Sequence, residues 1–135
     1  MDVKQRLRAV RRHNQRIDSK VEALRRLRSK AEKITTVYSD TPGVGGNTDK
    51  VGDILARIMD LENELAREFR ELKSALIAAE MMINSLEDPD QQAALDLYYI
   101  GGKTWKEVAR ELNWQERQIY RIHGEALAIL NKTCQ

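Results

Sequence analysis

The stretch KTWKEVARELNWQERQIYRI, residues 103–122, predicts two helices that meet at a tight corner. Thr104 suits the N-cap of the first helix, and Glu107, three residues later, completes a capping box. Asn113 stands at the corner, and the second helix is expected over residues 115–131. The apolar residues expected to face inward are Trp105, Val108, Ala109, Leu112, Ile119, Ile122, Ala126 and Leu130. A short helix, a corner and a longer helix with exposed polar residues at its start are typical of a helix-turn-helix.

A further helix is expected directly before this pair. Pro89 suits the first turn of a helix, and Gly101-Gly102 marks its end. Its apolar residues on one side are Ala94, Leu95, Tyr98 and Tyr99. Residues 89–135 are therefore predicted to form a helix-turn-helix domain of their own.

Two long heptad patterns precede residue 89. The first contains Val3, Leu7, Val10, Asn14, Ile17, Val21, Leu24, Arg28 and Ala31. The second contains Val51, Ile54, Ile58, Leu61, Leu65, Phe69, Leu72, Leu76, Ala79, Ile83 and Leu86. Two successive four-residue steps, from Leu61 to Leu65 to Phe69, predict a stutter in the second pattern. Asn14 interrupts the first pattern, and it either fixes the register or reaches solvent at a loose seam.

The segment 39–48 separates the two patterns. It contains Pro42 and three glycines, and it is predicted to be a loop between helices at about 2–37 and 49–87. Two helices of similar length joined by a short loop predict an antiparallel helical hairpin, a coiled coil, as a domain over residues 1–88. The predicted fold class is all-α, a long antiparallel hairpin followed by the helix-turn-helix.

Composition supports long helices and argues against several classes of protein. Charged residues make up 33% and aromatic residues 5%, which is typical of helical rather than sheet proteins. No apolar run is long enough to span a membrane. The only cysteine, Cys134, excludes a disulfide framework and fits a reducing cytoplasm. Cys134, His13 and His123 do not make a plausible metal site, so neither a metal nor a cofactor is expected.

Charge is distributed unevenly along the chain. Residues 1–38 carry twelve Lys and Arg against four Asp and Glu, whereas residues 49–90 carry five against eleven. This separation indicates either two helices that attract each other or a basic arm for nucleic acid. The first interpretation is the simpler one, because a hairpin would bring the two segments together.

The helix-turn-helix region resembles the fourth region of bacterial sigma factors, which reads the −35 promoter element. The matching residues are Glu107-Val108-Ala109, Leu112-Asn113-Trp114, Ile119, Ile122, Ala126-Leu127 and Leu130. Gln115 departs from the Ser or Thr that usually caps the recognition helix in that family. Glu116 stands where primary sigma factors have an arginine, which implies that a different DNA sequence is read.

Nearly the whole chain is similar to a family of small phage and prophage proteins. The heptad helix, Asn47-Thr-Asp-Lys50, Asp88-Pro89-Asp90 and Tyr99-Ile-Gly-Gly-Lys-Thr-Trp105 carry this resemblance. These proteins are known as sigma-region-4-like or RinA/ArpU-type late transcriptional regulators. The resemblance implies binding to double-stranded DNA in a bacterial host cell, and sigma region 4 itself can also contact RNA polymerase.

The candidate contacts with DNA lie on both helices of the pair. The predicted base contacts are Glu116, Arg117, Tyr120 and Arg121, which the resemblance to sigma region 4 also assigns to base-reading positions. Arginine pairs bidentately with guanine, and a glutamate can accept from cytosine. The predicted phosphate contacts are Lys103, Thr104, Lys106, Arg110 and Gln118. The alternative is that these are ordinary solvent-exposed residues, and for Thr104 a capping role is compatible with either.

Other conspicuous residues are expected to be structural. Trp105 and Trp114 have the spacing of buried anchors, and His123 is expected to be packed or hydrogen-bonded. No nucleophile, base and acid fall into a catalytic arrangement, so an enzyme is not expected.

The sequence thus predicts a sequence-specific DNA-binding transcriptional regulator that reads the major groove with residues 115–131. Its hairpin would form a homodimer or contact RNA polymerase or another protein. One alternative is a phage DNA-packaging protein similar to terminase small subunits. Another is a coiled-coil adaptor whose helix-turn-helix binds protein rather than DNA.

Overall fold

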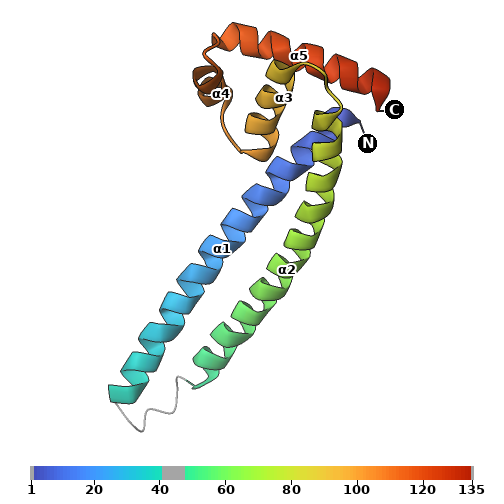
Figure 1. The fold of residues 1–135 in the computed structure, drawn as a ribbon. Coiled ribbons are helices and arrows are strands. Elements are labelled where there is room, and N and C mark those ends of the chain that lie inside the picture. The colour runs from blue at the N-terminus through green and yellow to red at the C-terminus, as the bar shows by residue number, and fades with distance from the viewer. Residues whose placement is uncertain (1, 41–47, 135) are drawn as a thin grey trace. The chain divides into compact units, whose positions relative to one another are not determined.

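A computed structural model describes the backbone of residues 2–40 and 48–134, and the side chains of residues 2–34 and 49–134. The elements, in chain order, are α1 (Val3–Asp40), α2 (Thr48–Asn84), α3 (Pro89–Leu95), η2 (Asp96–Ile100), α4 (Trp105–Leu112) and α5 (Glu116–Thr133), as labelled in Figure 1. Within these described ranges every regular element is helical, which confirms the predicted all-α fold class. No helix in them is both long enough and apolar enough to cross a membrane.

The chain divides into two compact units. Residues 15–70 form one, here called the hairpin unit, and residues 1–14 together with 71–135 form the other, the terminal unit. The first turns of α1 and the last turns of α2 thus group with the C-terminal helices. The predicted domain boundary between residues 88 and 89 stays a prediction.

Oppositely charged side chains join the two helices of the hairpin unit. Arg16 pairs with Glu68 at 3.6 Å, Lys20 with Glu64 at 3.1 Å, and Arg28 with Glu62 at 3.0 Å. As the residue number rises along α1, the number of its partner on α2 falls. The two helices therefore run antiparallel, as predicted. The hydrogen bond from Lys20 lowers the pKa of the Glu64 carboxyl. The pair of Arg28 with Glu62 is exposed on both sides, and such a surface pair adds little stability.

The apolar seam of the hairpin unit differs from the predicted one at Phe69. Buried positions include Ile17, Leu24, Ile58, Leu61 and Leu65. The next seam residue is Glu68, which is 9% exposed, while Phe69 is 52% exposed. A step of three from Leu65 to Glu68 restores the alternation of four and three, so the predicted stutter is absent. Phe69 lies about 100° further around the helix and therefore points away from the seam.

The predicted loop over residues 39–48 is too long at both ends. Ser39 and Asp40 belong to α1, and Thr48 is the first residue of α2. The first helix breaker in this part of the sequence is Pro42, so nothing at Ser39 or Asp40 opposes helix formation. The remainder of the predicted loop, residues 41–47, lies outside the described residues.

α2 ends at Asn84, three residues before the predicted position. Ser85 and Leu86 instead donate their backbone N–H groups to the carbonyls three residues earlier, Met82 at 3.2 Å and Ile83 at 3.1 Å. This tighter turn satisfies carbonyls that the end of a helix leaves free. Asp88 is extended, as expected before Pro89, and its side chain accepts from the backbone N–H of Asp90 to cap α3.

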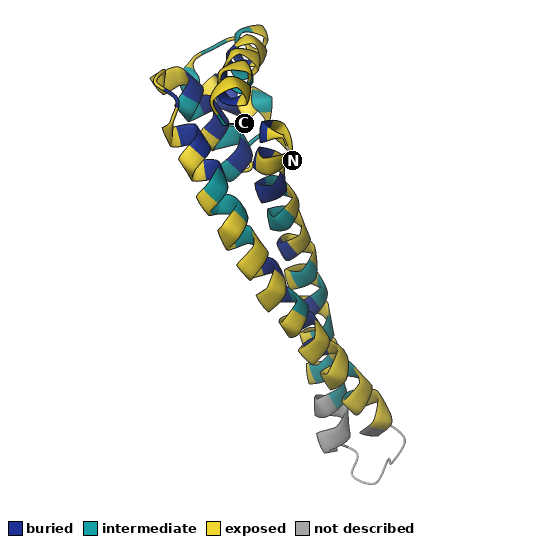
Figure 2. Cartoon of the chain, turned by 90° about the vertical axis from the view of Figure 1, so that its right-hand side faces the viewer, coloured by how far each residue is buried: buried dark blue, intermediate teal, exposed yellow. Residues whose placement is uncertain are grey.

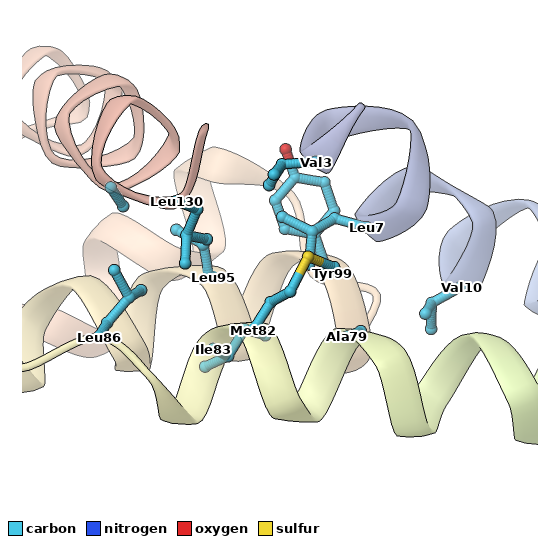
Figure 3. Packing of buried hydrophobic residues seen from close by; sticks show 11 residues of the cluster. Val3, Leu7, Val10, Ala79, Met82, Ile83, Leu86, Leu95, Tyr99 and Leu130 are labelled. Atoms are coloured by element: carbon cyan, nitrogen blue, oxygen red, sulfur yellow. The ribbon is translucent and has the colours of Figure 1, made fainter. Parts of the chain in front are cut away.

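The core of the terminal unit is built from five helical segments. Its buried members are Val3, Leu7, Val10, Ala79, Met82, Ile83, Leu86, Leu95, Tyr99, Ala126 and Leu130, most of which Figure 3 labels. Figure 2 colours each residue by burial and shows that the helices carry buried residues on one side and exposed residues on the other. Tyr99 is the largest fully buried side chain, at 1% exposure. Residues from both chain ends therefore stabilise one core.

The helix that starts at Pro89 changes its winding before Gly101. Residues 96–100 form a π-helical turn, closed by the bond from the Gly101 N–H to the Asp96 carbonyl at 2.9 Å. A Cβ at residue 101 would lie 2.7 Å from the Leu97 carbonyl oxygen, so this turn requires glycine. The sequence did not indicate the π turn, which sets the directions of Tyr98 and Tyr99.

Candidate nucleic-acid interface

A second apolar cluster fixes α4 against α5. Its buried members are Ala94, Val108, Ala109, Ile119 and Ile122, and all four of those in α4 and α5 were predicted to face inward. Leu112, Trp105 and Trp114 pack against this cluster while half-buried. The two helices are thus held by contacts of small and branched side chains, which allow a close approach.

The start of α4 is a complete capping box. The Glu107 N–H donates to the Thr104 hydroxyl oxygen at 3.2 Å, and the Thr104 N–H donates to the Glu107 carboxylate at 3.2 Å. The Thr104 backbone and hydroxyl donors lower the pKa of the Glu107 carboxyl, and Lys103 and Arg110 add to the effect. The capping role of Thr104 is confirmed, and it places a carboxylate beside the helix N-terminus.

Asn113 makes the corner between α4 and α5, as predicted. Its φ of 58° and ψ of 41° are left-handed, a conformation that asparagine tolerates better than most residues. The Trp114 N–H donates to the Ala109 carbonyl oxygen at 2.8 Å, which closes the end of α4. The turn is thereby short enough to keep both helices on the same apolar cluster.

α5 begins one residue later than predicted, at Glu116, with Gln115 as its N-cap. The Gln115 N–H donates to the Gln118 side-chain oxygen at 3.1 Å. This bond is one half of a capping box and satisfies the backbone N–H of the N-cap residue. Gln118, a predicted phosphate contact, is half-buried and holds the helix start in place.

The four predicted base contacts share the outward face of α5. Glu116, Arg117, Tyr120 and Arg121 are all exposed, and Tyr120 is 52% exposed. Residues four apart on a helix lie above one another, so Glu116 stands over Tyr120 and Arg117 over Arg121. Arg121 is 3.9 Å from Glu125, a loose pair between two exposed side chains. This face therefore presents two guanidinium groups, a carboxylate and a phenol to solvent.

The predicted phosphate contacts around α4 differ in their surroundings. The ammonium group of Lys103 pairs with Glu111 at 3.1 Å, whereas Lys106 and Arg110 are exposed. Cations at the start of a helix, together with its N–H groups, favour an anion, but the Glu107 carboxylate opposes it there. Lys106 lies in the first turn of α4 and Arg110 in its last turn, and their contact with phosphate stays a prediction.

An aromatic cluster behind α5 was only partly expected. The ring of Tyr98 stacks on Trp105 with centroids 3.8 Å apart, and Trp105 lies 4.5 Å from His123. The Tyr99 hydroxyl is 2.6 Å from His123 Nε2, which confirms the expected hydrogen-bonded role of the histidine. Burial, then Lys4 and Arg8, lowers the pKa of His123 to about 4. Burial, then Tyr98, raises the pKa of Tyr99 to about 12, so both groups are neutral at pH 7.

Arg11 ties α1 to the segment before α4. Its guanidinium donates to the carbonyls of Tyr98 at 2.5 Å and Lys103 at 3.1 Å, and lies 4.2 Å from the centre of the Tyr98 ring. These carbonyls come from the π turn and the loop that follows it. Sequence reasoning missed this contact, because no local pattern distinguishes Arg11 from its many basic neighbours.

Comparison with known proteins places the chain in a family. Residues 33–131 match the family model described as "Protein of unknown function (DUF1492)", and the chain belongs to this family. The matched region includes all of α2, α3, η2 and α4 and most of α5. No curated protein and no solved structure matches the chain significantly.

Proposed function

We propose that this member of the DUF1492 family binds double-stranded DNA and regulates transcription, with α5 in the major groove. The observation that carries the proposal is the exposed face of α5, on which Arg117 and Arg121 stand beside Glu116 and Tyr120. Each side chain has a suitable partner on a base edge. A guanidinium pairs with O6 and N7 of guanine, and a carboxylate accepts from the amino group of cytosine.

The support around α5 suits this role. The capping contacts of Gln115 and Gln118 and the buried Ile119 and Ile122 hold the start of the helix in one position. Base readout needs such a fixed helix, because a bidentate contact tolerates little displacement. Lys106 and Arg110, on the preceding helix, would position the protein on the backbone without reading sequence.

The test is selection of binding sites from a random library of DNA duplexes by the full-length protein. We expect enrichment of a short motif whose length matches one or two major-groove contacts. The same selection with Arg117→Ala and Arg121→Ala together should enrich no motif. Absence of binding to any duplex by the wild-type protein at about 50 mM salt, where phosphate contacts are strong, would exclude the proposal.

The hairpin unit has exposed apolar side chains that suit a contact with protein. Leu55, Met59 and Phe69, on α2, are 50%, 63% and 52% exposed. We propose that a second copy of the chain covers them, because two copies would bring two reading helices to one DNA site. The mass of the purified protein tests this, since a dimer supports a regulator and a ring of many subunits supports the DNA-packaging alternative.

A further inference from the structure

The first turns of α1 carry exposed cations that take no part in the core of the terminal unit. Lys4, Arg8 and Arg12 are four residues apart and exposed, and we call them the N-terminal basic row. Among the residues that the structure describes, none forms an ion pair with these three. The cations Arg16, Lys20 and Arg28 of the hairpin unit differ, since each has a carboxylate partner on α2.

Arg11 fixes the direction of this row. It lies next to Arg12 and seven residues after Lys4, so its side chain points to nearly the same side of the helix as Lys4. Because Arg11 donates to the Tyr98 and Lys103 carbonyls, that side of α1 borders the segment that leads into α4. Val3, Leu7 and Val10 on the adjacent face are buried with Tyr99 and Leu130, so the first turns of α1 cannot rotate.

The first turns of α1 also share a core with α5, because Val3 and Leu7 belong to one buried cluster with Ala126 and Leu130. The charges of Lys4 and Arg8 contribute to the lowered pKa of His123. Trp105, at the start of α4, and His123 are 4.5 Å apart, and Tyr120 lies 6.0 Å from Trp105. The row therefore belongs to the same compact unit as α4 and α5, and it lies on the part of α1 that contacts the segment leading into α4 through Arg11.

We propose that Lys4, Arg8 and Arg12 bind the phosphate backbone of the DNA duplex that α5 reads. This inference rests on the proposed function and adds a contact surface from outside the α4–α5 pair. The row rises by about 12 Å, at 1.5 Å per residue, which is long enough to face more than one phosphate, since each strand carries one phosphate per ~3.4 Å of the duplex axis. Within the part of the chain that the structure describes, no ion pair of these three cations has to break when they meet the charge of DNA.

The experiment measures binding of the full-length protein to a labelled duplex at several salt concentrations. Each phosphate contact that is lost should lower the slope of log K against log salt by about 0.9. We expect the triple variant Lys4→Gln, Arg8→Gln, Arg12→Gln to lose about two to three units of slope. Its preference for the selected site over scrambled DNA should be unchanged, because phosphate contacts carry no sequence information.

Two controls remove cations outside the row, and the second matches its change in charge. Arg6→Gln removes an exposed cation from the same turns of α1, but two residues from Lys4 and Arg8 and thus on nearly the opposite side. The triple variant Arg26→Gln, Lys30→Gln, Lys33→Gln removes three exposed cations from α1 in the hairpin unit. Both should keep slopes closer to the wild-type value than the row variant does. Lys4→Arg, Arg8→Lys, Arg12→Lys should keep the wild-type slope and show that charge is what matters.

Wild-type binding with an unchanged slope in the row variant would overturn this inference and leave the proposed function intact. An equal loss in the hairpin triple variant would also overturn it, because net charge alone would then explain the effect. Failure of the wild-type protein to bind any duplex would overturn both proposals. Thermal melting by circular dichroism should show that the row variant is folded, since all three side chains are exposed.

Discussion

Single residues on α5 divide into those that hold the helix and those that face solvent. Ile119 and Ile122 are buried, whereas Arg117 and Arg121 are exposed, as the apolar spacing predicted. What periodicity could not predict is the partners of polar residues that lie far apart in sequence. The contact of Arg11 with Tyr98 was missed altogether, and for His123 a hydrogen bond was expected but not its partner Tyr99.

Arginines on α5 and a lysine on α4 should affect DNA binding in different ways. Arg117→Ala and Arg121→Ala should each cost about 1–3 kcal/mol at the selected site and relax discrimination at one base pair. Lys106→Ala should weaken binding to all sequences alike and lower the salt slope by about one unit. A competition titration of selected against scrambled duplex separates the two effects. If both arginine variants kept the wild-type preference, α5 would not be the reading helix.

His123 should make the terminal unit less stable in mild acid. Its pKa is about 4 in the folded protein and about 6.5 in an unfolded chain, so between these values the unfolded state binds more protons. The stabilisation is complete above pH 6.5 and is lost as the pH falls toward 4. Because the ring is only partly buried, we expect a loss of about 1–2 kcal/mol rather than the full effect of the shift.

Chemical denaturation at pH 7.0, 5.5 and 4.5 measures this loss. His123→Gln lowers stability at pH 7, because it loses ring packing, but it should remove this part of the pH dependence. His13→Gln is the matched control, since His13 lies on α1 and belongs to the same unit. Equal pH dependence in the wild-type protein and His123→Gln would show that another group is responsible.

Among the elements, the helices were predictable and their ends were less so. Heptad spacing and the capping box at Thr104 predicted α1, α2, α4 and α5 to within a few residues. The exchange of Phe69 for Glu68 in the seam was missed, because apolar spacing alone cannot show that a glutamate is buried beside an arginine. The π turn was missed because it depends on how Tyr98 and Tyr99 pack, not on the local sequence. Of the candidate site, spacing predicted which residues α5 exposes but not the ion pair of Lys103 or the cap at Gln118.

Two glycines in helical elements should respond in opposite ways to replacement by alanine. Gly124 lies on the exposed side of α5, and a Cβ there would meet no atom within 4 Å. Gly124→Ala should therefore raise the free energy of unfolding by about 0.5–1 kcal/mol. Gly101→Ala should lower it by about 1–3 kcal/mol, because the new Cβ would lie against the Leu97 backbone. Urea denaturation of both variants measures the difference, and stabilisation by Gly101→Ala would contradict the tight π turn.

At the scale of the whole molecule, the charge pattern separates into two groups of cations on α1. Arg16, Lys20 and Arg28 pair with carboxylates of α2, which supports the interpretation that the two helices attract each other. The N-terminal basic row has no such partner among the described residues, and there the interpretation as a surface for nucleic acid is our proposal. Attraction between the two helices therefore accounts for some of the cations of α1, and the proposed contact with nucleic acid for others.

Self-association through the hairpin unit can be tested at the same scale. Leu55→Gln with Met59→Gln removes two exposed apolar side chains of α2, and we expect it to convert a dimer into a monomer. Ile129→Gln, which changes a side chain 44% exposed on α5, is the control and should leave the mass unchanged. Light scattering coupled to size-exclusion chromatography measures the mass. A wild-type monomer at all concentrations would contradict the proposed pairing.

The stacking of Trp105 on Tyr98 gives the protein a built-in optical reporter. The indole lies 3.8 Å from the Tyr98 ring and 6.0 Å from that of Tyr120, which stands on the outward face of α5. A molecule that settles against Tyr120 would change the polarity around this indole and shift its emission. Replacing the other tryptophan, as in Trp114→Phe, would leave Trp105 as the single tryptophan, whose emission can be excited selectively over that of the tyrosines. Occupancy of the α5 face could then be followed in real time without attaching a dye to either partner.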